Sequence, residues 1–349
     1  MIKTQILEMA KKRIILLDGA MGTYIQNMSL SEDKFRGSRF KKSEISLKGN
    51  YDILNITNPR IIYKIHTLYL EKGADIIKTN TFNSTSTSQL DYNCDQLNHE
   101  LNFEGAKIAK QSVKDFEKKN KKAKRFVAGV IGPTNRTCSM SPDVNRPEFR
   151  NINFDDLKKD YFISIKGLVE GGADIILLET IFDTLNAKAA LFAKNQFEQK
   201  YKKKIPLMIS VTIADLSGRT LSGQTLEAFY NSVIHSEPIS VGINCALGPK
   251  ELEPHLKELN RFCNPLISIH PNAGLPNAFG GYDESPESMA KFAESWAKNR
   301  LINIIGSCCG TYPEHIYALK NILVKLKPRQ IQEINQGFRL SGLSPYNMS

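Results

Sequence analysis

Short apolar runs rich in isoleucine and valine recur along the chain, and each follows a charged, amphipathic stretch. Eight such runs can be counted, at residues 14–17, 74–77, 126–131, 173–178, 207–213, 240–243, 266–269 and 302–305. Runs this short and apolar are typical of strands buried on both faces of a parallel sheet, with helices as the connections. The pattern therefore predicts alternating strands and helices.

The number of strands favours one architecture. Eight strands with helical crossovers fit a closed TIM barrel. A doubly wound open sheet is the alternative, but no glycine-rich dinucleotide fingerprint follows the first run. The similar phrases 71–77 and 170–176 each place a glycine helix stop just before a strand. We expect one α/β domain, a (β/α)8 barrel over residues 1–325, with an insertion at 29–50 and a polar tail at 326–349.

The chain is basic, with 47 Lys+Arg against 36 Asp+Glu and a formal net charge of +11. The lysines are spread over predicted helix faces, with short clusters at 118–124 and 200–204. Neither cluster has interleaved aromatic residues or a known binding motif, so we expect solvated surface and no nucleic-acid binding. The charge could instead favour docking to an acidic partner protein.

No part of the sequence indicates export or membrane insertion. Residues 1–12 mix charged with apolar side chains and lack the core of a secretory signal, and no later stretch is apolar enough to span a membrane. We expect a cytoplasmic protein. Reducing conditions there would keep the six cysteines as thiols.

Three of the cysteines follow predicted strands. Cys245 comes directly after the sixth run, and Cys308 and Cys309 follow the eighth. Thiols from two strand ends of one barrel mouth could hold one zinc ion and leave a coordination position open, as catalytic zinc sites do. The spacing matches no zinc-finger pattern, and burial as small hydrophobes is the alternative. No role is assigned to the scattered cysteines Cys94, Cys138 and Cys263.

Carboxylates and small residues also follow strands. Asp18 and a turn of small residues end the first run, and Glu179 ends the fourth. Two carboxylates at one mouth suit an ammonium group, and the exposed amides of the turn suit a carboxylate. A helix N-cap and a surface salt bridge are the alternatives. The position after strands favours binding the head of an amino acid, with the candidate residues Asp18, Gly19, Ala20, Met21 and Glu179.

Several of these strand ends resemble the homocysteine S-methyltransferases, from about residue 14 to about residue 343. The matching segments are 18–23, 79–82, 132–134, 179–180, 242–245, 270–274 and 306–310. The segments 35–40, 47–52 and 141–145 look like the amino-terminal, homocysteine-binding module of cobalamin-dependent methionine synthase. The branches that use betaine or S-methylmethionine differ there.

The resemblance implies a TIM barrel that transfers a methyl group to the thiol of L-homocysteine, giving L-methionine. It implies zinc on Cys245, Cys308 and Cys309, with Asn272 supplying an oxygen ligand until the substrate thiol replaces it. A free thiol has a pKa of about 8.5 and is mostly protonated at neutral pH, and coordination to a dication removes that proton.

The resemblance also assigns the amino end of the substrate to Asp18 and Glu179. One residue departs from it, because Lys78 stands where the synthase module usually has a glutamate. This cation could weaken binding of the amino group or pair with Glu179. A lysine at a barrel strand end could also form a Schiff base, so a lyase is a rival interpretation.

The methyl donor is expected to come from another protein. None of the histidines is preceded two residues earlier by an aspartate, so the cobalamin signature Asp-x-His-x-x-Gly is absent. Methylcobalamin on a separate module is the expected donor, beside a separate folate module, because the tail around 339–343 resembles the junction to that module. The chain would then be one module by itself or a piece of a longer chain. Two alternatives stay open: a small donor such as S-methylmethionine or betaine, and a non-catalytic zinc-binding scaffold.

Overall fold

Eight parallel strands form one sheet in the order β1-β8-β7-β6-β5-β4-β3-β2. The computed structural model describes residues 2–121, 123–214, 217–278, 280–334 and 337–348. The strands are β1 (Ile15–Leu16), β2 (Ile76–Lys78), β3 (Phe126–Ile131), β4 (Ile175–Ile181), β5 (Leu207–Val211), β6 (Ser240–Asn244), β7 (Leu266–His270) and β8 (Ile304–Ile305). Every predicted run overlaps one of them, which confirms the eight-strand prediction.

The two edges of the sheet meet and close the barrel. A parallel bridge joins Leu17 to Ile76, beyond the end of β1. The Asp75 amide donates to the Leu16 carbonyl at 2.7 Å, and the Asp18 amide donates to the Ile76 carbonyl at 3.1 Å. The TIM-barrel prediction is therefore confirmed, and the carboxyl ends of the strands, which carry the candidate residues, face one mouth.

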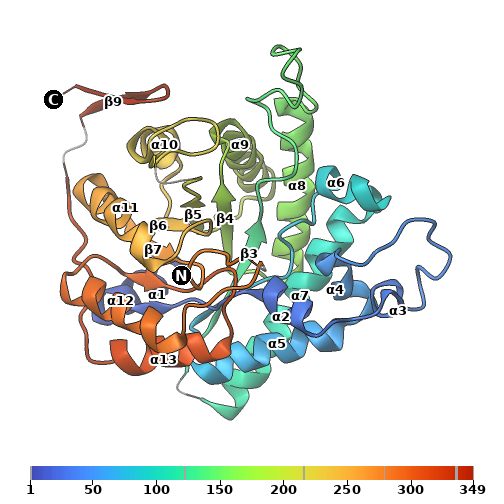
Figure 1. Cartoon of the computed structure of the whole chain (residues 1–349), viewed down its shortest axis with the longest axis horizontal. Helices are drawn as coiled ribbons and strands as arrows, with labels where there is room; N and C mark the ends of the chain where they lie inside the picture. The colour runs from blue at the N-terminus through green and yellow to red at the C-terminus, as the bar shows by residue number, and fades with distance from the viewer. Residues whose placement is uncertain (1, 122, 215–216, 279, 335–336, 349) are drawn as a thin grey trace.

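One helix follows each strand and packs outside the barrel, as the ring of helices in Figure 1 shows. Two of the helices end where the sequence predicted a glycine stop, at Gly73 (φ 116°) and Gly172 (φ 105°). These angles are left-handed, a conformation that glycine adopts without steric cost. The eight helices are α5 (Pro59–Lys72), α7 (Asn98–Lys119), α8 (Phe154–Gly171), α9 (Thr184–Tyr201), α10 (Leu226–Val233), α11 (Pro249–Phe262), α12 (Pro286–Lys298) and α13 (Pro313–Leu323).

The apolar core has two layers. The outer layer lies between the sheet and the helices. The inner layer consists of side chains inside the barrel, such as Leu177 and Met208, and it includes Ile6 and Ala10 of α1 (Ile2–Lys12). Helix α1 thus closes the amino end of the barrel with apolar side chains and leaves the carboxyl end for chemistry.

The chain also forms short helices outside the eight strand–helix units. They are α2 (Met21–Asn27), α3 (Glu32–Arg36), η1 (Tyr51–Ile53), α4 (Leu54–Thr57), α6 (Ser86–Gln89), η2 (Leu90–Tyr92), η3 (Asp95–Leu97) and η4 (Ile234–Ser236). Three of them, α2, α3 and η1, are built by the segment between β1 and α4, which includes the predicted insertion at 29–50. Among the described residues, no helix combines the length and apolar character that crossing a membrane requires.

The tail is more ordered than its polar composition suggested. It forms an antiparallel hairpin of β9 (Phe338–Ser341) and β10 (Pro345–Met348), which packs on α10; Figure 1 shows β9 beyond α10. Arg329 is 2 % exposed, and its Nε donates to Asn260 Oδ1 at 2.6 Å. The tail residues 335, 336 and 349 lie outside the described residues. The described residues of the segment 326–349 are therefore attached to the barrel.

Candidate metal and substrate site

The three strand-end cysteines come together at the carboxyl mouth. The Sγ atoms of Cys245, Cys308 and Cys309 all lie within 4.8 Å of one another, and those of Cys245 and Cys309 are 3.7 Å apart. A tetrahedral zinc with Zn–S bonds of about 2.3 Å places its sulfur ligands about 3.8 Å apart. The spacing of these thiols therefore fits the ion.

The thiols need a cation to ionise together. The pKa of Cys245 is raised to about 12, first by its hydrogen-bonding contact with Cys308. Contact with Cys309 and burial outweigh the opposite effect of Cys245 and raise the pKa of Cys308 to about 12. Contact with Cys245 raises that of Cys309 to about 11. Crowded thiols that resist ionisation alone but lie at metal-ligand spacing are suited to a dication, which removes their protons.

Unusual backbone conformations hold this cluster. Cys245 and Ala246 have φ values of 64° and 59°, and Thr180 at the end of β4 has a φ of 59°. Non-glycine residues in this left-handed region are strained. Such residues are often found at functional sites, where the surrounding structure holds them in that conformation. Asn244 provides that enforcement, because its Oδ1 accepts the Thr180 amide at 2.9 Å and its Nδ2 donates to Thr180 Oγ1 at 2.8 Å. The sequence alone does not indicate this role for Asn244.

Asn272 lies against the thiol cluster, in the loop after β7. Its Oδ1 accepts the backbone N–H of Cys309 at 3.1 Å, and the side chain is buried. An amide oxygen has two lone pairs, so this contact leaves one for another partner. The structure therefore places the Asn272 amide next to Cys309, and its role as a metal ligand stays a prediction.

Asp18 is buried at the same mouth with an incomplete set of hydrogen bonds. Its Oδ2 accepts the Lys78 amide at 2.8 Å, while the buried Oδ1 has no partner within the described part of the chain. Burial raises the pKa of Asp18 to about 7, against the lowering effect of the Lys78 charge. A buried polar atom without a partner in an open mouth is a place where a ligand can bind.

Glu179 pairs with Lys78 across the barrel. Lys78 Nζ lies 3.3 Å from Glu179 Oε2, and the two side chains are 11 % and 8 % exposed. Burial disfavours the charged amine, but the carboxylates of Glu179 and Asp18 outweigh it and raise the pKa of Lys78. The amine therefore stays protonated and is a poor nucleophile, which disfavours the Schiff-base lyase.

The turn after Asp18 is tightly packed against β8 and its neighbours. A Cβ on Gly19 would lie 2.8 Å from Ser307 Oγ and 2.9 Å from Tyr69 Oη, so the close approach requires glycine. Thr311 Oγ1 accepts the Ala20 amide at 3.2 Å. The amides of Gly19 and Met21 donate to no residue that the structure describes. Of the three predicted amide donors, Ala20 is already engaged.

The other three cysteines, Cys94, Cys138 and Cys263, are buried and free, and none joins a metal-spaced group of described residues.

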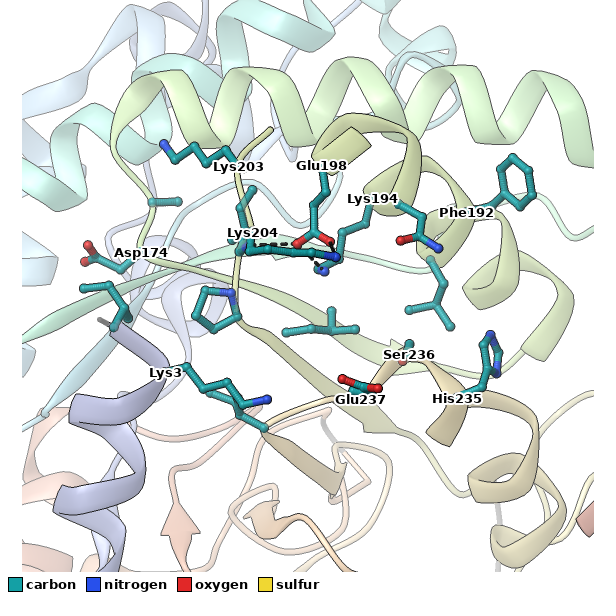
Figure 2. A pocket seen from close by; sticks show the side chains of 18 of the residues that line it. Lys3, Asp174, Phe192, Lys194, Glu198, Lys203, Lys204, His235, Ser236 and Glu237 are labelled. Atoms are coloured by element: carbon teal, nitrogen blue, oxygen red, sulfur yellow. Dashed lines mark hydrogen bonds and ion pairs between the residues drawn. The ribbon is translucent and has the colours of Figure 1, made fainter. Parts of the chain in front are cut away.

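A cavity of about 1080 Å³ lies away from the thiol cluster, along α9 and the amino ends of β4 to β6. Figure 2 shows Lys194 and Lys204 converging there on Glu198. Lys204 is exposed, but Lys194 and Glu198 form a buried ion pair outside the mouth, like that of Lys78 and Glu179.

Comparison with known proteins decides the family. Residues 15–323 match the family described as homocysteine S-methyltransferase. The chain belongs to the homocysteine S-methyltransferase family. Its members are methyltransferases, and the family resemblance of the strand-end motifs is thereby confirmed.

Solved structures of homocysteine methyltransferase MmuM from Escherichia coli share the fold. The metallated form is 19 % identical, with a TM-score of 0.70, and the alignment covers 92 % of this chain and 99 % of that chain. The oxidized form is 19 % identical, with a TM-score of 0.69 and coverage of 88 % and 95 %. At this identity the likeness concerns the barrel alone.

Within this homocysteine S-methyltransferase family member, the structure also places residues that sequence reasoning missed. His270 ends β7, is fully buried, and neither ring nitrogen has a described partner. Burial, followed by the Lys78 charge, holds the pKa of His270 well below its usual value, so the ring is neutral. The phenol of Tyr282 lies close enough to Cys309 to have its pKa raised to about 12, mainly by burial and then by that thiol. Tyr282 belongs to no recognisable motif, so its position beside Cys309 is seen only in the folded structure.

Proposed function

We propose that this protein transfers a methyl group to the thiol of L-homocysteine, giving L-methionine, with zinc as its resident metal. One observation carries the proposal: three thiols at zinc-ligand spacing share a barrel mouth with two buried carboxylates. The family is a homocysteine methyltransferase family, and one of the MmuM structures is of a metallated form. The mouth offers both a sulfur-binding centre and a site for an amino-acid head group.

The cysteines Cys245, Cys308 and Cys309 would hold the ion, with Asn272 as an oxygen ligand in the absence of substrate. Zinc bound there would remove the thiol proton of homocysteine and keep its sulfur nucleophilic. The new bond forms between that sulfur and the methyl carbon, and the donor keeps the electron pair of the bond that breaks. The protein orients the sulfur for this displacement, which needs the reacting atoms within about 3 to 3.5 Å.

The head group of homocysteine would bind beside the metal. The negative charge of the Asp18 and Glu179 carboxylates suits its ammonium, and the unengaged amides of Gly19 and Met21 suit its carboxylate. The crowding of Gly19 against Ser307 packs this turn against the loop after β8, which carries two of the thiols. Binding the head group and holding the sulfur are thereby coupled through one packed contact.

We further infer that methylcobalamin on a separate protein is the donor. The synthase-like segments 35–40, 47–52 and 141–145 lie between β1 and α4 and between β3 and α8, on the mouth side of the barrel, and the first two include residues of α3 and η1. Val144 is 95 % exposed and Leu221, in the loop after β5, is 60 % exposed. Single exposed apolar side chains such as these are common on protein surfaces, so the donor proposal rests on the resemblance of the three segments. Separate cobalamin-binding and folate-binding proteins would be the partners.

A small donor, S-methylmethionine or betaine, is the second candidate. The alignment with MmuM covers 99 % of that chain, so a barrel of this extent constitutes nearly a whole homocysteine methyltransferase there. A barrel that works alone needs a donor small enough to enter the mouth. The third candidate is a zinc-binding scaffold without turnover, an alternative that the sequence leaves open.

A donor panel tests the proposal. Zinc-loaded protein and homocysteine are mixed with methylcobalamin on a carrier module, free methylcobalamin, S-methylmethionine or betaine, and methionine is measured. We expect the carrier-bound corrinoid to react fastest, with a rate that falls at high salt because the basic surface assists docking. Faster reaction with either small donor rejects the synthase-like branch and supports the second candidate. Zinc binding without methionine from any donor supports the scaffold.

A further inference from the structure

Lys78 is a charged residue that the proposed function leaves without a task. It ends β2, and its side chain lies in the mouth of the barrel, 11 % exposed. Lysines are almost never buried unless they are paired, and this one is paired with Glu179 at 3.3 Å. One of the two carboxylates expected to bind an ammonium therefore already holds one.

Asp18 is in a different state. Its Oδ2 is engaged by the Lys78 backbone amide, whereas the buried Oδ1 accepts no hydrogen bond from any described residue. The two carboxylates are thus unequal. Glu179 has a cation in contact, and Asp18 presents a free acceptor in the same mouth.

A second ammonium at Glu179 would approach the ammonium of Lys78, and like charges a few ångströms apart repel strongly where water is scarce. An ammonium at Asp18 Oδ1 would satisfy an acceptor that lacks a partner. We propose that Lys78 is a specificity-determining positioning residue, which keeps Glu179 occupied so that Asp18 alone reads the amino group of the acceptor thiol. This inference rests on the proposed function and divides the roles of two residues within it.

The division predicts an unusual response to substitution. Glu179→Gln would release the Lys78 ammonium, which would then turn to Asp18 and compete with the substrate. Removing both partners, as in Lys78→Met with Glu179→Gln, would leave Asp18 free again. If Glu179 itself bound the substrate, the double variant would stay as defective as the single one.

The measurement isolates the amino group. Isothermal titration calorimetry of zinc-loaded protein gives the Kd of L-homocysteine and of 4-mercaptobutyrate, which lacks the amino group, and their ratio reports how strongly that group is read. We expect a ratio above about tenfold in the wild type, near one in Asp18→Asn and several-fold lower than wild type in Glu179→Gln. The double variant should return to within about threefold of the wild type. A double variant that stays at the Glu179→Gln value overturns the inference.

A matched control is the buried pair of Lys194 and Glu198, 2.7 Å apart at the cavity in Figure 2. Glu198→Gln, alone or with Lys194→Met, should leave the ratio unchanged. Zinc content and thermal unfolding check each variant, and Lys78→Gln replaces Lys78→Met if the latter does not fold. Wild type that holds zinc but binds no homocysteine overturns the proposed function itself. Tight homocysteine binding with a wild-type ratio near one overturns only the division of roles between Asp18 and Lys78.

Discussion

The two ends of the barrel differ in what fills them. At the amino end, Ile6 and Ala10 of α1 fill the opening with apolar side chains. Buried charge there is paired, since Asp75 contacts Arg13 at 2.6 Å and Arg125 at 3.2 Å. At the carboxyl mouth, buried atoms of Asp18 and His270 have no partner among the described residues. Unpartnered buried atoms are not confined to the mouth, because Arg125 Nε and Ser240 Oγ at the amino end also lack a partner among the described residues. What distinguishes the mouth is its cluster of three thiols at metal-ligand spacing.

Backbone strain follows the same division. At the amino end, Lys202 and Glu237 are left-handed, but both are exposed residues that end helices, where such a conformation is common. At the mouth, Thr134 is buried and Thr180 and Cys245 are partly buried, and all three lie at or just beyond strand ends. At the mouth, packing holds these residues in the left-handed conformation and so orients their side chains. At the amino end, the same conformation only terminates helices.

Removing the thiols should have the largest effect on the carboxyl mouth. We expect Cys245→Ala, Cys308→Ala or Cys309→Ala to lose the metal or hold it weakly and to reduce turnover more than about a hundredfold, because each removes one ligand from a three-thiol set. Metal analysis by mass spectrometry checks this, with Cys94→Ala as the control that keeps its zinc. Full zinc content in the Cys308→Ala, Cys309→Ala double variant would exclude this site.

The opposite end is tested by Ile6→Ala. Ile6 is fully buried in the inner core, and truncation to alanine leaves a cavity that typically lowers the free energy of unfolding by about 2 to 5 kcal/mol. We expect a lower midpoint in chemical denaturation and an unchanged Kd for homocysteine at temperatures where the variant is folded. A weaker Kd would show that the two ends are coupled.

A smaller effect concerns pH. Burial raises the pKa of Asp18 to about 7, so the carboxylate is charged above that pH and protonated below it. A neutral Asp18 cannot balance an ammonium, and the preference for homocysteine over 4-mercaptobutyrate should therefore fall about tenfold between pH 8 and pH 6. Calorimetry at both pH values measures this preference, and comparing the two ligands cancels ionisation of their shared thiol. The preference of Asp18→Asn should not change with pH; a flat wild-type profile would contradict the assignment.

The smallest expected effect separates the two kinds of strain. Lys202→Gly should raise the free energy of unfolding by up to about 1 kcal/mol, because glycine adopts a left-handed conformation without steric cost. Ala246→Gly relieves similar strain beside Cys245 but also loosens the loop that aims its thiol. We expect zinc to dissociate several-fold faster from Ala246→Gly and at the wild-type rate from Lys202→Gly, measured with a chelating dye. Equal rates would show that strain at the mouth does not position the metal ligand.

Much of the fold could be predicted from sequence because burial on both faces leaves a strong local signal. The run at 207–213 and the glycine stop at Gly73 are local features, and both appear in the structure. The proximity of Cys245 to Cys308 and Cys309 could be predicted from topology, since the carboxyl ends of parallel strands in one barrel lie on the same face. The tail was harder, because β9 and β10 are stabilised by docking on α10 and not by their own apolar pattern.

The parts of the site that escaped prediction depend on contacts between distant segments. Whether Lys78 would oppose the substrate or pair with Glu179 could not be decided from sequence, because the answer is a 3.3 Å contact across the barrel. Asn244 belongs to a recognisable motif, but its role as the partner of Thr180 depends on how β4 and β6 lie on either side of β5. Tyr282 reaches Cys309 from a different loop and carries no motif.

The closure of the barrel also sets an order of events during synthesis. The first strand, with Asp18 at its end, pairs with the last strand, and Ser307 donates its amide to the Asp18 carbonyl at 3.1 Å. A chain emerging from the ribosome has made Asp18 and Cys245 long before Cys308 and Cys309 exist. Neither the proposed metal site nor the proposed substrate site can form until the eighth strand is made and pairs with the first. Metal uptake by a growing chain would therefore report that the barrel has closed.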